Sequence, residues 1–207
     1  IDNIYKREKS RKWINELYDI PKDSILFGYI GRLVDWKNVD FLIYCFSKYI
    51  KKSNLHIHLI IVGDGDNKYL DSLKKLTHKL EVKNIVTFAG FNSEPDRVIS
   101  AFDLMIAPSN KEPFGRTLVE AMIQKTPILA ARGGGHSGII NNEVTGRLYD
   151  HNNVDDFIDK CEIFFNNSES NYEIINKAND TAYIKYSAHK HAENIIQIYK
   201  NLSKFIH

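Results

Sequence analysis

Short apolar runs recur along the chain, and they limit its possible folds more than any other feature. Five of them alternate with segments of helical periodicity: "SILFGYI" (24–30), "HIHLIIV" (56–62), "NIVTFAG" (84–90), "FDLMIAP" (102–108) and "TPILAA" (126–131). A shorter run, "TGRLYD" (145–150), follows. Nearly continuous apolar runs are typical of parallel strands that are covered by helices on both faces. The pattern therefore predicts an α/β domain with a doubly wound parallel sheet.

The segments before and after these runs have a helical pattern. The first 23 residues, rich in Lys, Arg and Tyr, are expected to form a helix or linker that leads into the first strand. After about residue 153 the chain is helical to its end, and Ser187 is expected to cap the last helix. We therefore expect three parts: a helix or linker at 1–23, a ligand-binding domain at 24–186 and a closing helix at 187–207.

The composition excludes several classes of protein. The chain of 207 residues carries 28 basic and 26 acidic residues, with a net charge of +2, so no nucleic-acid partner is expected. No apolar run approaches the roughly eighteen residues of a membrane span. The two cysteines, Cys45 and Cys161, have no metal-ligand spacing, which favours reduced core residues and a cytoplasmic location. We therefore expect a globular, cytoplasmic protein without a metal site.

In a doubly wound sheet the ligand binds beyond the carboxyl ends of the strands, so the loops after the strands are the candidate sites. The first loop, "GRLVDWKN", begins at Gly31 and carries Arg32 and Lys37. A guanidinium group can bind two phosphate oxygens and an ammonium group acts as a point charge, which together suit a diphosphate. On this loop alone, a pair of solvated surface charges is the alternative interpretation.

The loop after the fourth run, "SNKEPFGRTLVEAM", carries two carboxylates across a predicted helix start. The amides of Gly115 to Leu118 are expected to be free donors at that start, which favours an anion. Glu120 lies about one turn further, where it can accept both hydroxyl groups of a ribose. Glu112 would face whatever is attached beyond the phosphates. Alternatively, Glu112 caps the helix and complements its dipole, and Glu120 is an ordinary surface residue.

Two further loops contain residues with possible roles in a site. The segment "VGDGDNKYL" lacks the third glycine of a dinucleotide fingerprint, and a tight turn explains its Asp64 and Asp66 better than a metal site does. The segment "ARGGGHSGIINN" has three consecutive glycines, which let the backbone pass close to a ligand. His136 beside them could contact a sugar hydroxyl, but a solvent-facing loop histidine is the commoner case and is what we expect.

Six motifs occur in the order found in one family: "GRLVDWKN", "VGDG", "VTFAGF", "APSNKEPFGRTLVEAM", "TPILAARGGG" and "VTGRLYD". The region from Ile25 to Asp150 resembles the retaining GT-B glycosyltransferases of the glycogen-synthase-like, group 1 kind. The resemblance implies the Rossmann-like carboxy-terminal half of a GT-B fold, with a helical tail. It also implies that Glu112 faces the donor sugar and that Glu120 binds the ribose diol.

The resemblance implies roles for further residues. Arg32 and Lys37 would grip the diphosphate, and with Glu112 they are the expected catalytic residues. The expected substrate-binding residues lie around the phosphates, the ribose and the base: Gly31, Phe91, Asn92, Phe114, Gly115, Arg116, Thr117, Leu118 and Glu120. Negative charge grows on the diphosphate as the sugar leaves, and fixed cations and helix amides would stabilise it. We therefore expect neither a metal nor a cofactor.

The same resemblance implies the reaction and its setting. The family transfers a sugar from a nucleotide-diphosphate sugar, most commonly UDP-linked, to an acceptor with retention of anomeric configuration. The acceptor, a saccharide or a lipid-linked molecule, would be bound by an amino-terminal domain. A role in bacterial surface polysaccharide or glycolipid synthesis is expected, in the cytoplasm or at the inner face of the membrane, with peripheral membrane association of the full-length protein as one option.

The chain departs from the family pattern in two respects. The family's glycine loop usually reads Gly-Gly-x-x-Glu, whereas Gly138 occupies the glutamate position here, so this loop's contacts to the donor sugar are in question. A chain that begins at Ile1 without the amino-terminal domain suggests a fragment. We therefore expect it to bind the nucleotide sugar and to transfer sugar poorly or not at all by itself.

In the family the last helix packs on the amino-terminal domain. The corresponding segment here carries a broad apolar stripe: Ile195, Ile196, Ile198, Tyr199 and Leu202. Two interpretations are open. The stripe packs wholly on this domain, or half of it lacks a cover within the chain.

Other functions remain as alternatives. A nucleotide-sugar epimerase or a phosphorylase of the same architecture would keep the anion site but use no separate acceptor. A non-catalytic nucleotide-sensing module would keep only the binding site. A metal-dependent transferase would use Asp64 and Asp66, and a chelator would distinguish it. An NAD-dependent dehydrogenase is disfavoured because its fingerprint is incomplete.

Overall fold

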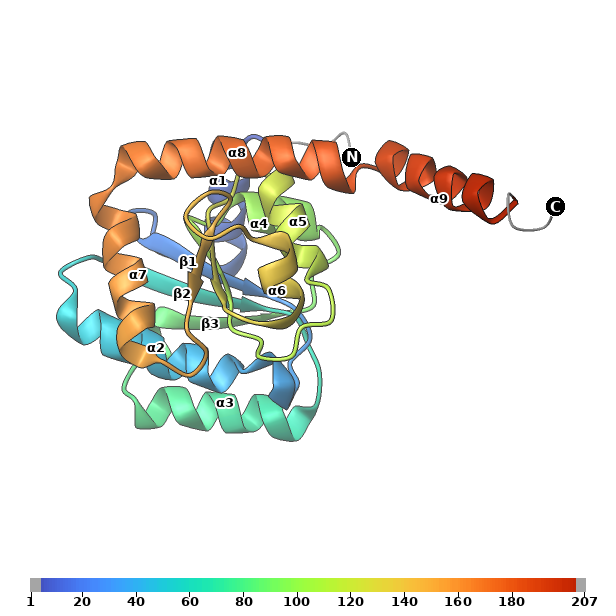
Figure 1. The fold of residues 1–207 in the computed structure, drawn as a ribbon. Helices are drawn as coiled ribbons and strands as arrows, with labels where there is room; N and C mark the ends of the chain where they lie inside the picture. Colours follow the sequence, from blue (N-terminus) through green and yellow to red (C-terminus); the bar gives the residue numbers. More distant parts are fainter. Residues whose placement is uncertain (1–4, 204–207) are drawn as a thin grey trace.

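The computed structural model describes residues 5–203 and contains a six-stranded sheet with helices on both faces (Figure 1). Neighbouring strands are all parallel, in the order β3-β2-β1-β4-β5-β6. Their bounds are β1 Ile25–Ile30, β2 Ile57–Val62, β3 Val86–Gly90, β4 Leu104–Ala107, β5 Ile128–Ala131 and β6 Arg147–Tyr149. This is the strand order of a Rossmann sheet, so the predicted doubly wound fold is confirmed.

The helices connect the strands and continue beyond the sheet. Their bounds are α1 Arg7–Tyr18, α2 Val39–Lys52, α3 Asn67–Lys79, α4 Pro95–Ser100, α5 Arg116–Ile123, α6 Gly134–Ile139, α7 Val154–Asn166, α8 Ser168–Tyr186 and α9 Ala188–Ser203, with short 3-10 helices η1 Asp35–Lys37 and η2 Lys83–Ile85. Each predicted strand run contains an observed strand. Helix α6 lies in the glycine-rich segment that was predicted to be a loop, because glycine lowers helical propensity.

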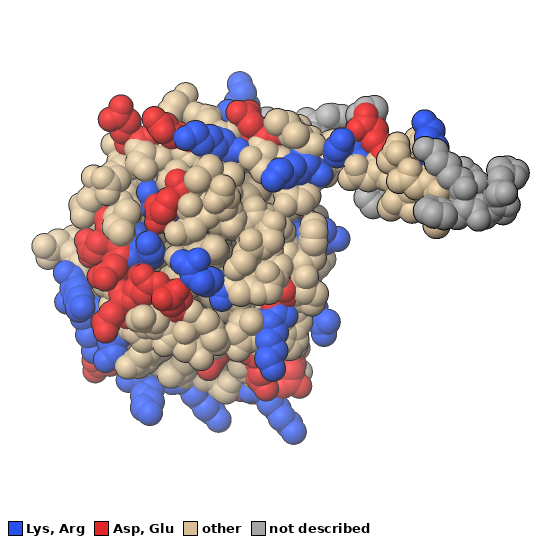
Figure 2. All heavy atoms as spheres, in the orientation of Figure 1, with Lys and Arg blue, Asp and Glu red and all other residues tan. Residues whose placement is uncertain are grey.

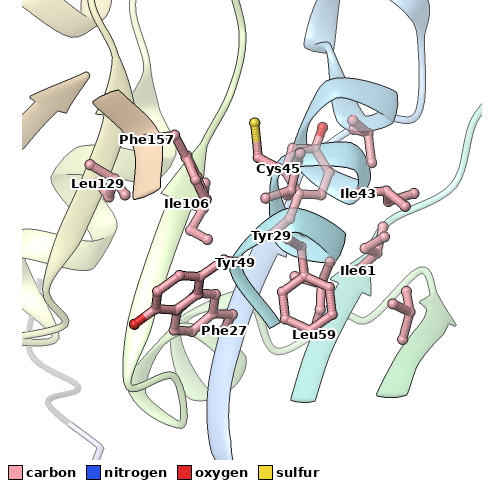
Figure 3. Close-up of a cluster of buried hydrophobic side chains, with 14 of the residues drawn as sticks. Phe27, Tyr29, Ile43, Cys45, Tyr49, Leu59, Ile61, Ile106, Leu129 and Phe157 are labelled. Carbon is pink, nitrogen blue, oxygen red and sulfur yellow. The ribbon is translucent and has the colours of Figure 1, made fainter. Parts of the chain in front are cut away.

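Alternate residues of each strand point to opposite faces of the sheet and build two cores. In β2, Leu59 packs in the core under α2, α3 and α7, whereas its neighbour Ile60 packs in the core under α1, α4, α5 and α8. Figure 3 shows the first core, with Phe27 and Cys45 among its side chains. Cys45 and Cys161 are buried free thiols, as predicted. The two cores fix the sheet and therefore the loops at its carboxyl edge.

Helix α1 is fixed to the sheet domain. Ile14 is fully buried in the core that also contains α4 and α8. The hydroxyl of Ser100 donates to the hydroxyl of Ser10 at 2.7 Å, and Arg11 Nη1 donates to Asp103 Oδ2 at 2.8 Å. The domain boundary predicted at residue 23 stays a prediction, but α1 packs as part of the same folded unit.

Helix α9 leaves the body of the molecule after α8 (Figure 1). The Ser187 hydroxyl accepts a hydrogen bond from the amide of Lys190 at 3.1 Å, which confirms the predicted N-cap. The apolar stripe of α9 is exposed over its whole length: Ile195, Ile196, Ile198, Tyr199 and Leu202. The interpretation that this stripe packs wholly on the domain is therefore wrong.

The surface carries charges of both signs. On the face drawn in Figure 2, basic side chains line the edge formed by α3, and acidic side chains gather near α7, which begins with Asp155 and Asp156. Neither sign covers this face alone. Among the helices of residues 5–203, none combines the length and the apolar character that crossing a membrane requires.

Candidate functional site

The loops that follow β1 and β4 meet where the strand order reverses. Strand β1 lies between β2 and β4, so the connections from this point run to opposite sides and leave a crevice at the carboxyl ends of the strands. A pocket of about 450 Å³ opens there. Seven of the predicted site residues line it: Gly31, Arg32, Phe91, Asn92, Arg116, Thr117 and Glu120. These seven residues come from three segments that are far apart in the sequence, and residues 62–64 at the end of β2 add a fourth.

Hydrogen bonds fix the backbone at Arg32, and its guanidinium group is free to contact a ligand. Its carbonyl accepts a hydrogen bond of 2.9 Å from the Tyr29 hydroxyl. The next amide, that of Leu33, donates to the carbonyl of Asp64 at 2.9 Å. The exposed Arg32 side chain lines the pocket, and no carboxylate of the described residues pairs with it. The fold therefore presents an unpaired cation to the pocket.

Lys37 and Glu112 form an ion pair across the same crevice. Lys37 ends η1, after β1, and Glu112 lies in the loop after β4, with Nζ 2.5 Å from Oε2. Their side chains are only 17% and 13% exposed, and Nζ lies 4.5 Å from the centroid of the Trp36 ring. Glu112 lies against Gly115, the residue before the pocket residue Arg116. The pair is therefore next to the pocket rather than in its wall.

The first turn of α5 presents backbone amides to the pocket. Gly115 caps the helix with a φ of 94°. Glu112 accepts no hydrogen bond from the amides of this turn in the described part of the chain, so the alternative in which it caps the helix is wrong. The amide of Leu118 donates to the Gly115 carbonyl at 2.9 Å, which corrects the prediction that this amide is free. The amides of Arg116 and Thr117 have no acceptor among residues 5–203.

Glu120 lines the pocket from the next turn of α5. Its side chain is 21% exposed, and Oε1 lies 3.1 Å from Arg116 Nε. Burial raises the pKa of the Glu120 carboxyl above its ordinary value; the charge of Arg116 opposes this rise and the charge of Asp96 adds to it. A half-buried carboxylate that is costly to ionise is a candidate functional group rather than an ordinary surface residue.

The loop after β3 contributes an exposed aromatic ring. Phe91 lines the pocket with 72% of its surface exposed. Asn92 also lines the pocket, but the fold uses its side chain: Nδ2 donates to the Tyr18 hydroxyl at 3.2 Å, and Oδ1 accepts from the amide of Glu94 at 2.8 Å. Phe91 is therefore the side chain of this loop that is free to contact a planar ligand.

Besides Lys37 and Glu112, two of the predicted residues have side chains that do not line the pocket. The ring of Phe114 meets the ring of Tyr186 edge-on, with 6.2 Å between the centroids. The side chain of Leu118 is fully buried in the core under α1 and α8. The structure brings their backbone near the pocket and directs their side chains to other contacts.

His136 is buried, which corrects the expectation of a solvent-facing loop histidine. Its side chain is 2% exposed within α6, and Nδ1 lies 2.9 Å from the carbonyl oxygen of Ala131. The preceding glycines let α6 approach the loop after β4. The amide of Gly135 donates to the Glu112 carbonyl at 2.7 Å, and a Cβ on Gly135 would lie 2.2 Å from the Phe114 carbonyl oxygen. Close contact between two backbone segments therefore requires glycine here.

Asp64 and Asp66 have separate roles in the structure. Oδ1 of Asp66 accepts from the amide of Tyr69 at 3.0 Å and caps α3, whereas Asp64 lines the pocket. Across the described residues, no group of three or more His, Cys, Asp or Glu side chains could hold a metal ion. Asp64, Ser93 and Pro95 are pocket residues that were not predicted. Their positions directly after β2 and β3 were the signal that could have identified them.

The strand order and the pocket at its switch point define a doubly wound α/β domain with a candidate ligand site at the carboxyl edge of its sheet. The family model of glycosyl transferases group 1 matches residues 10–181, which include every residue of the pocket. The chain belongs to the glycosyl transferases group 1 family.

Two relatives illustrate how much of a family member this chain represents. An uncharacterized glycosyltransferase of Methanocaldococcus jannaschii is 30% identical over 183 residues, which are 87% of this chain and 46% of the relative. The poly(ribitol-phosphate) alpha-N-acetylglucosaminyltransferase of Staphylococcus aureus is 30% identical over 203 residues, which are 98% of this chain and 40% of the relative. The chain therefore spans less than half the length of each.

A solved structure agrees with this placement. The crystal structure of a Staphylococcus aureus TarM mutant in complex with Fondaparinux, alpha-GlcNAc-glycerol and UDP is similar to this chain, with a TM-score of 0.75 and 29% sequence identity. The similarity covers 88% of this chain and 36% of TarM. The fold of the chain is thus the fold of one part of a larger enzyme of this kind.

Proposed function

We propose that this chain is the donor-binding part of a glycosyltransferase that takes a sugar from a nucleotide-diphosphate sugar. The observation that carries the proposal is the pocket at the β1/β4 switch point, which combines the unpaired Arg32 guanidinium, the first amides of α5 and the Glu120 carboxylate. A cation and helix amides suit a diphosphate, and a carboxylate suits the two hydroxyls of a ribose. Membership of the family supports the transfer reaction.

In this proposal each group binds one part of the donor. Arg32 and the amides of Arg116 and Thr117 bind the diphosphate, and Glu120 binds the ribose. Phe91 lies beside the base, where its exposed ring can stack. The UDP bound in the TarM complex supports a uridine nucleotide as the first donor to test.

The Lys37–Glu112 pair extends the site from the diphosphate toward the sugar. Its ammonium group can stabilise the negative charge that grows on the departing diphosphate, as the Arg32 guanidinium can. Its carboxylate can accept hydrogen bonds from sugar hydroxyls. Fixed cations and amides can supply this stabilisation without a metal. The proposal also includes retention of anomeric configuration, which the resemblance to the retaining family implies.

The acceptor site lies outside this chain in our proposal. The chain spans 46% and 40% of the two relatives, and its pocket is assigned in full to the donor. We therefore expect the 207-residue chain to bind the donor but to turn it over no faster than background.

Calorimetric titration tests the proposed function. The purified chain is titrated with UDP, GDP, ADP and their common sugar conjugates, with and without EDTA. We expect one base to be preferred, with a dissociation constant of roughly 10 μM to 1 mM, or about −7 to −4 kcal/mol, unchanged by EDTA. Absence of binding to every nucleotide would overturn the proposal, and a loss of binding in EDTA would overturn its metal-independent form. Rapid turnover by the chain alone would overturn the external acceptor site.

A further inference from the structure

A buried histidine beside the Lys37–Glu112 pair has one ring nitrogen without a partner. The side chain of His136 is 2% exposed, and its one hydrogen bond to the described residues joins Nδ1 to the carbonyl oxygen of Ala131 at 2.9 Å. A carbonyl oxygen can only accept, so Nδ1 carries the proton. In the neutral ring Nε2 is then an unprotonated hydrogen-bond acceptor.

The surroundings keep this ring neutral. Burial lowers the pKa of His136 below its ordinary value, and the charge of Lys37 lowers it further. The hydrogen bond to the Ala131 carbonyl and the charge of Glu112 raise the pKa, but each of these effects is smaller than the effect of burial. At neutral pH the imidazole therefore offers a lone pair at Nε2 rather than a second N–H.

The edge of the ring that carries Cδ2 lies beside Gly115. A Cβ placed on Gly115 would lie 3.4 Å from Cδ2 of His136 and 3.5 Å from Cγ of Glu112. The ring edge and the side-chain methylene of Glu112 thus lie against the same glycine, directly before the first pocket residue of α5. Cδ2 is bonded to Nε2, while Nδ1 lies on the other edge of the ring and points to Ala131. The unused acceptor is therefore on the ring edge that lies against Gly115, away from the edge that meets Ala131.

Nε2 of this nearly buried residue makes no hydrogen bond to another of the described residues, so it is available to a ligand. Two acceptors, Nε2 and the Glu112 carboxylate, are suited to a ligand that carries several O–H donors. Resting on the donor-binding function proposed above, we propose that His136 is a specificity residue of the donor-sugar site, whose Nε2 accepts a hydrogen bond from a hydroxyl of a neutral sugar. His136 does not line the pocket assigned to the nucleotide, so we expect its contribution to belong to the sugar alone.

The test compares each nucleotide sugar with its bare nucleoside diphosphate. UDP-glucose, ADP-glucose and GDP-mannose are titrated against the full chain beside UDP, ADP and GDP, and the ratio of the two dissociation constants measures the sugar's contribution. The apolar His136→Leu and His136→Met variants should bind the nucleotide sugar more weakly relative to the bare diphosphate. We expect the ratio of the diphosphate's dissociation constant to that of the nucleotide sugar to fall about tenfold, since one hydrogen bond is lost. The affinity for the bare diphosphate should stay unchanged. His136→Gln, which keeps an acceptor, should lose less than the apolar variants.

His58 provides a matched control for removing a buried histidine. It is 5% exposed and its Nε2 is already paired with the Thr87 hydroxyl at 2.8 Å, in β2. His58→Leu should leave the ratio unchanged, although it too removes a buried ring.

The outcomes separate the two proposals. If the folded apolar variants keep the wild-type ratio while the nucleotides still bind, the role of His136 is overturned and the donor site stands. If the wild-type chain binds neither diphosphates nor nucleotide sugars, both are overturned. Thermal unfolding shows which variants are folded. If His136→Leu does not fold, His136→Met provides the test.

Discussion

Arg32 is the side chain whose position most directly indicates a ligand, because the fold uses its backbone and leaves its guanidinium group unpaired. The Tyr29 hydroxyl holds its carbonyl, so the loop should survive Arg32→Ala. We expect this variant to lose about tenfold or more in affinity for the preferred nucleoside diphosphate, the loss typical of one charged hydrogen-bonding group. The free energy of unfolding should change by less than about 0.5 kcal/mol. Calorimetry and thermal unfolding measure the two quantities.

Arg7 is the control for this variant. It is also partly exposed, but it pairs with Asp103, which precedes β4 at the opposite edge of the sheet. Arg7→Ala should leave nucleotide affinity unchanged. Equal weakening by both variants would mean that only the overall charge matters, and would contradict the place of Arg32 in the site.

Glu120 links ligand binding to stability through its raised pKa. A carboxyl group whose pKa is higher in the folded than in the unfolded chain stabilises the fold when protonated, and this contribution is lost as the pH rises through the folded pKa. We therefore expect wild type to gain stability relative to Glu120→Gln as the pH falls from neutrality into the ordinary glutamate range. At neutral pH the variant should be at least as stable as wild type, yet bind nucleotide more weakly.

The measurement is thermal unfolding of both proteins between neutral pH and the ordinary glutamate range, with calorimetric titration at neutral pH. Because the other carboxyl groups are common to both proteins, they cancel in the difference. A stability difference that does not change with pH would contradict the assigned cause of the shift, and unchanged nucleotide affinity would remove Glu120 from the site.

At the scale of the elements, the Lys37–Glu112 pair joins the loops after β1 and β4. Because each side chain is largely buried, removing one partner leaves the other charge without a counter-charge. We expect Lys37→Met and Glu112→Gln each to lower the free energy of unfolding by about 1–3 kcal/mol. The double variant should be more stable than the sum of the two single-variant losses predicts, with a coupling free energy of about 1 kcal/mol or more. Chemical denaturation of the four proteins measures this.

The exposed pair of Arg132 and Asp150 is the control for this cycle, because its side chains are 48% and 62% exposed and its ions are separated by a similar 2.9 Å. A coupling of only about 0.2–1 kcal/mol is typical of such pairs. Additive single variants at Lys37 and Glu112 would show that the ion pair does not join the two loops.

Helices α1 and α9 contrast in how firmly they are attached. Ile14 of α1 is fully buried, whereas Ile198 of α9 is exposed. We expect Ile14→Ala to cost about 2–4 kcal/mol of unfolding free energy, through the cavity it leaves, and Ile198→Ala to cost less than about 0.5 kcal/mol. Chemical denaturation compares the two. Similar costs would mean that the α9 stripe is packed, or that α1 is not.

The strands could be predicted well because parallel strands that are buried on both faces consist of nearly continuous runs of apolar residues. Helix α6 could not, because its three glycines have low helical propensity and close backbone packing decides its conformation. The burial of His136 was missed for the same reason: it depends on the approach of α6 to the loop after β4, which is a tertiary contact. The prediction that the Leu118 amide is free was wrong because this amide donates a hydrogen bond to the Gly115 carbonyl within the tight first turn of α5.

At the scale of the whole molecule, the topology explains why the site could largely be located from the sequence. A doubly wound sheet brings the ends of its strands to one edge, so loops far apart in the chain could be assigned to one crevice. What the sequence could not supply is the pairing inside the crevice. That Lys37 meets Glu112, and that Asn92 is held by Tyr18, follows from side-chain packing between elements. The family resemblance implied residue roles, which stay predictions.

The most direct test of the central claim is an amide NMR titration of the nitrogen-15-labelled chain with UDP, or with whichever nucleoside diphosphate calorimetry selects. If the pocket at the β1/β4 switch point is the donor site, the largest shifts will fall on the amides of Gly31, Arg32, Phe91, Arg116 and Thr117. The amides of α3 and of the exposed part of α9 will stay unchanged. Saturating shifts elsewhere on the molecule, with these five amides unmoved, would contradict the account.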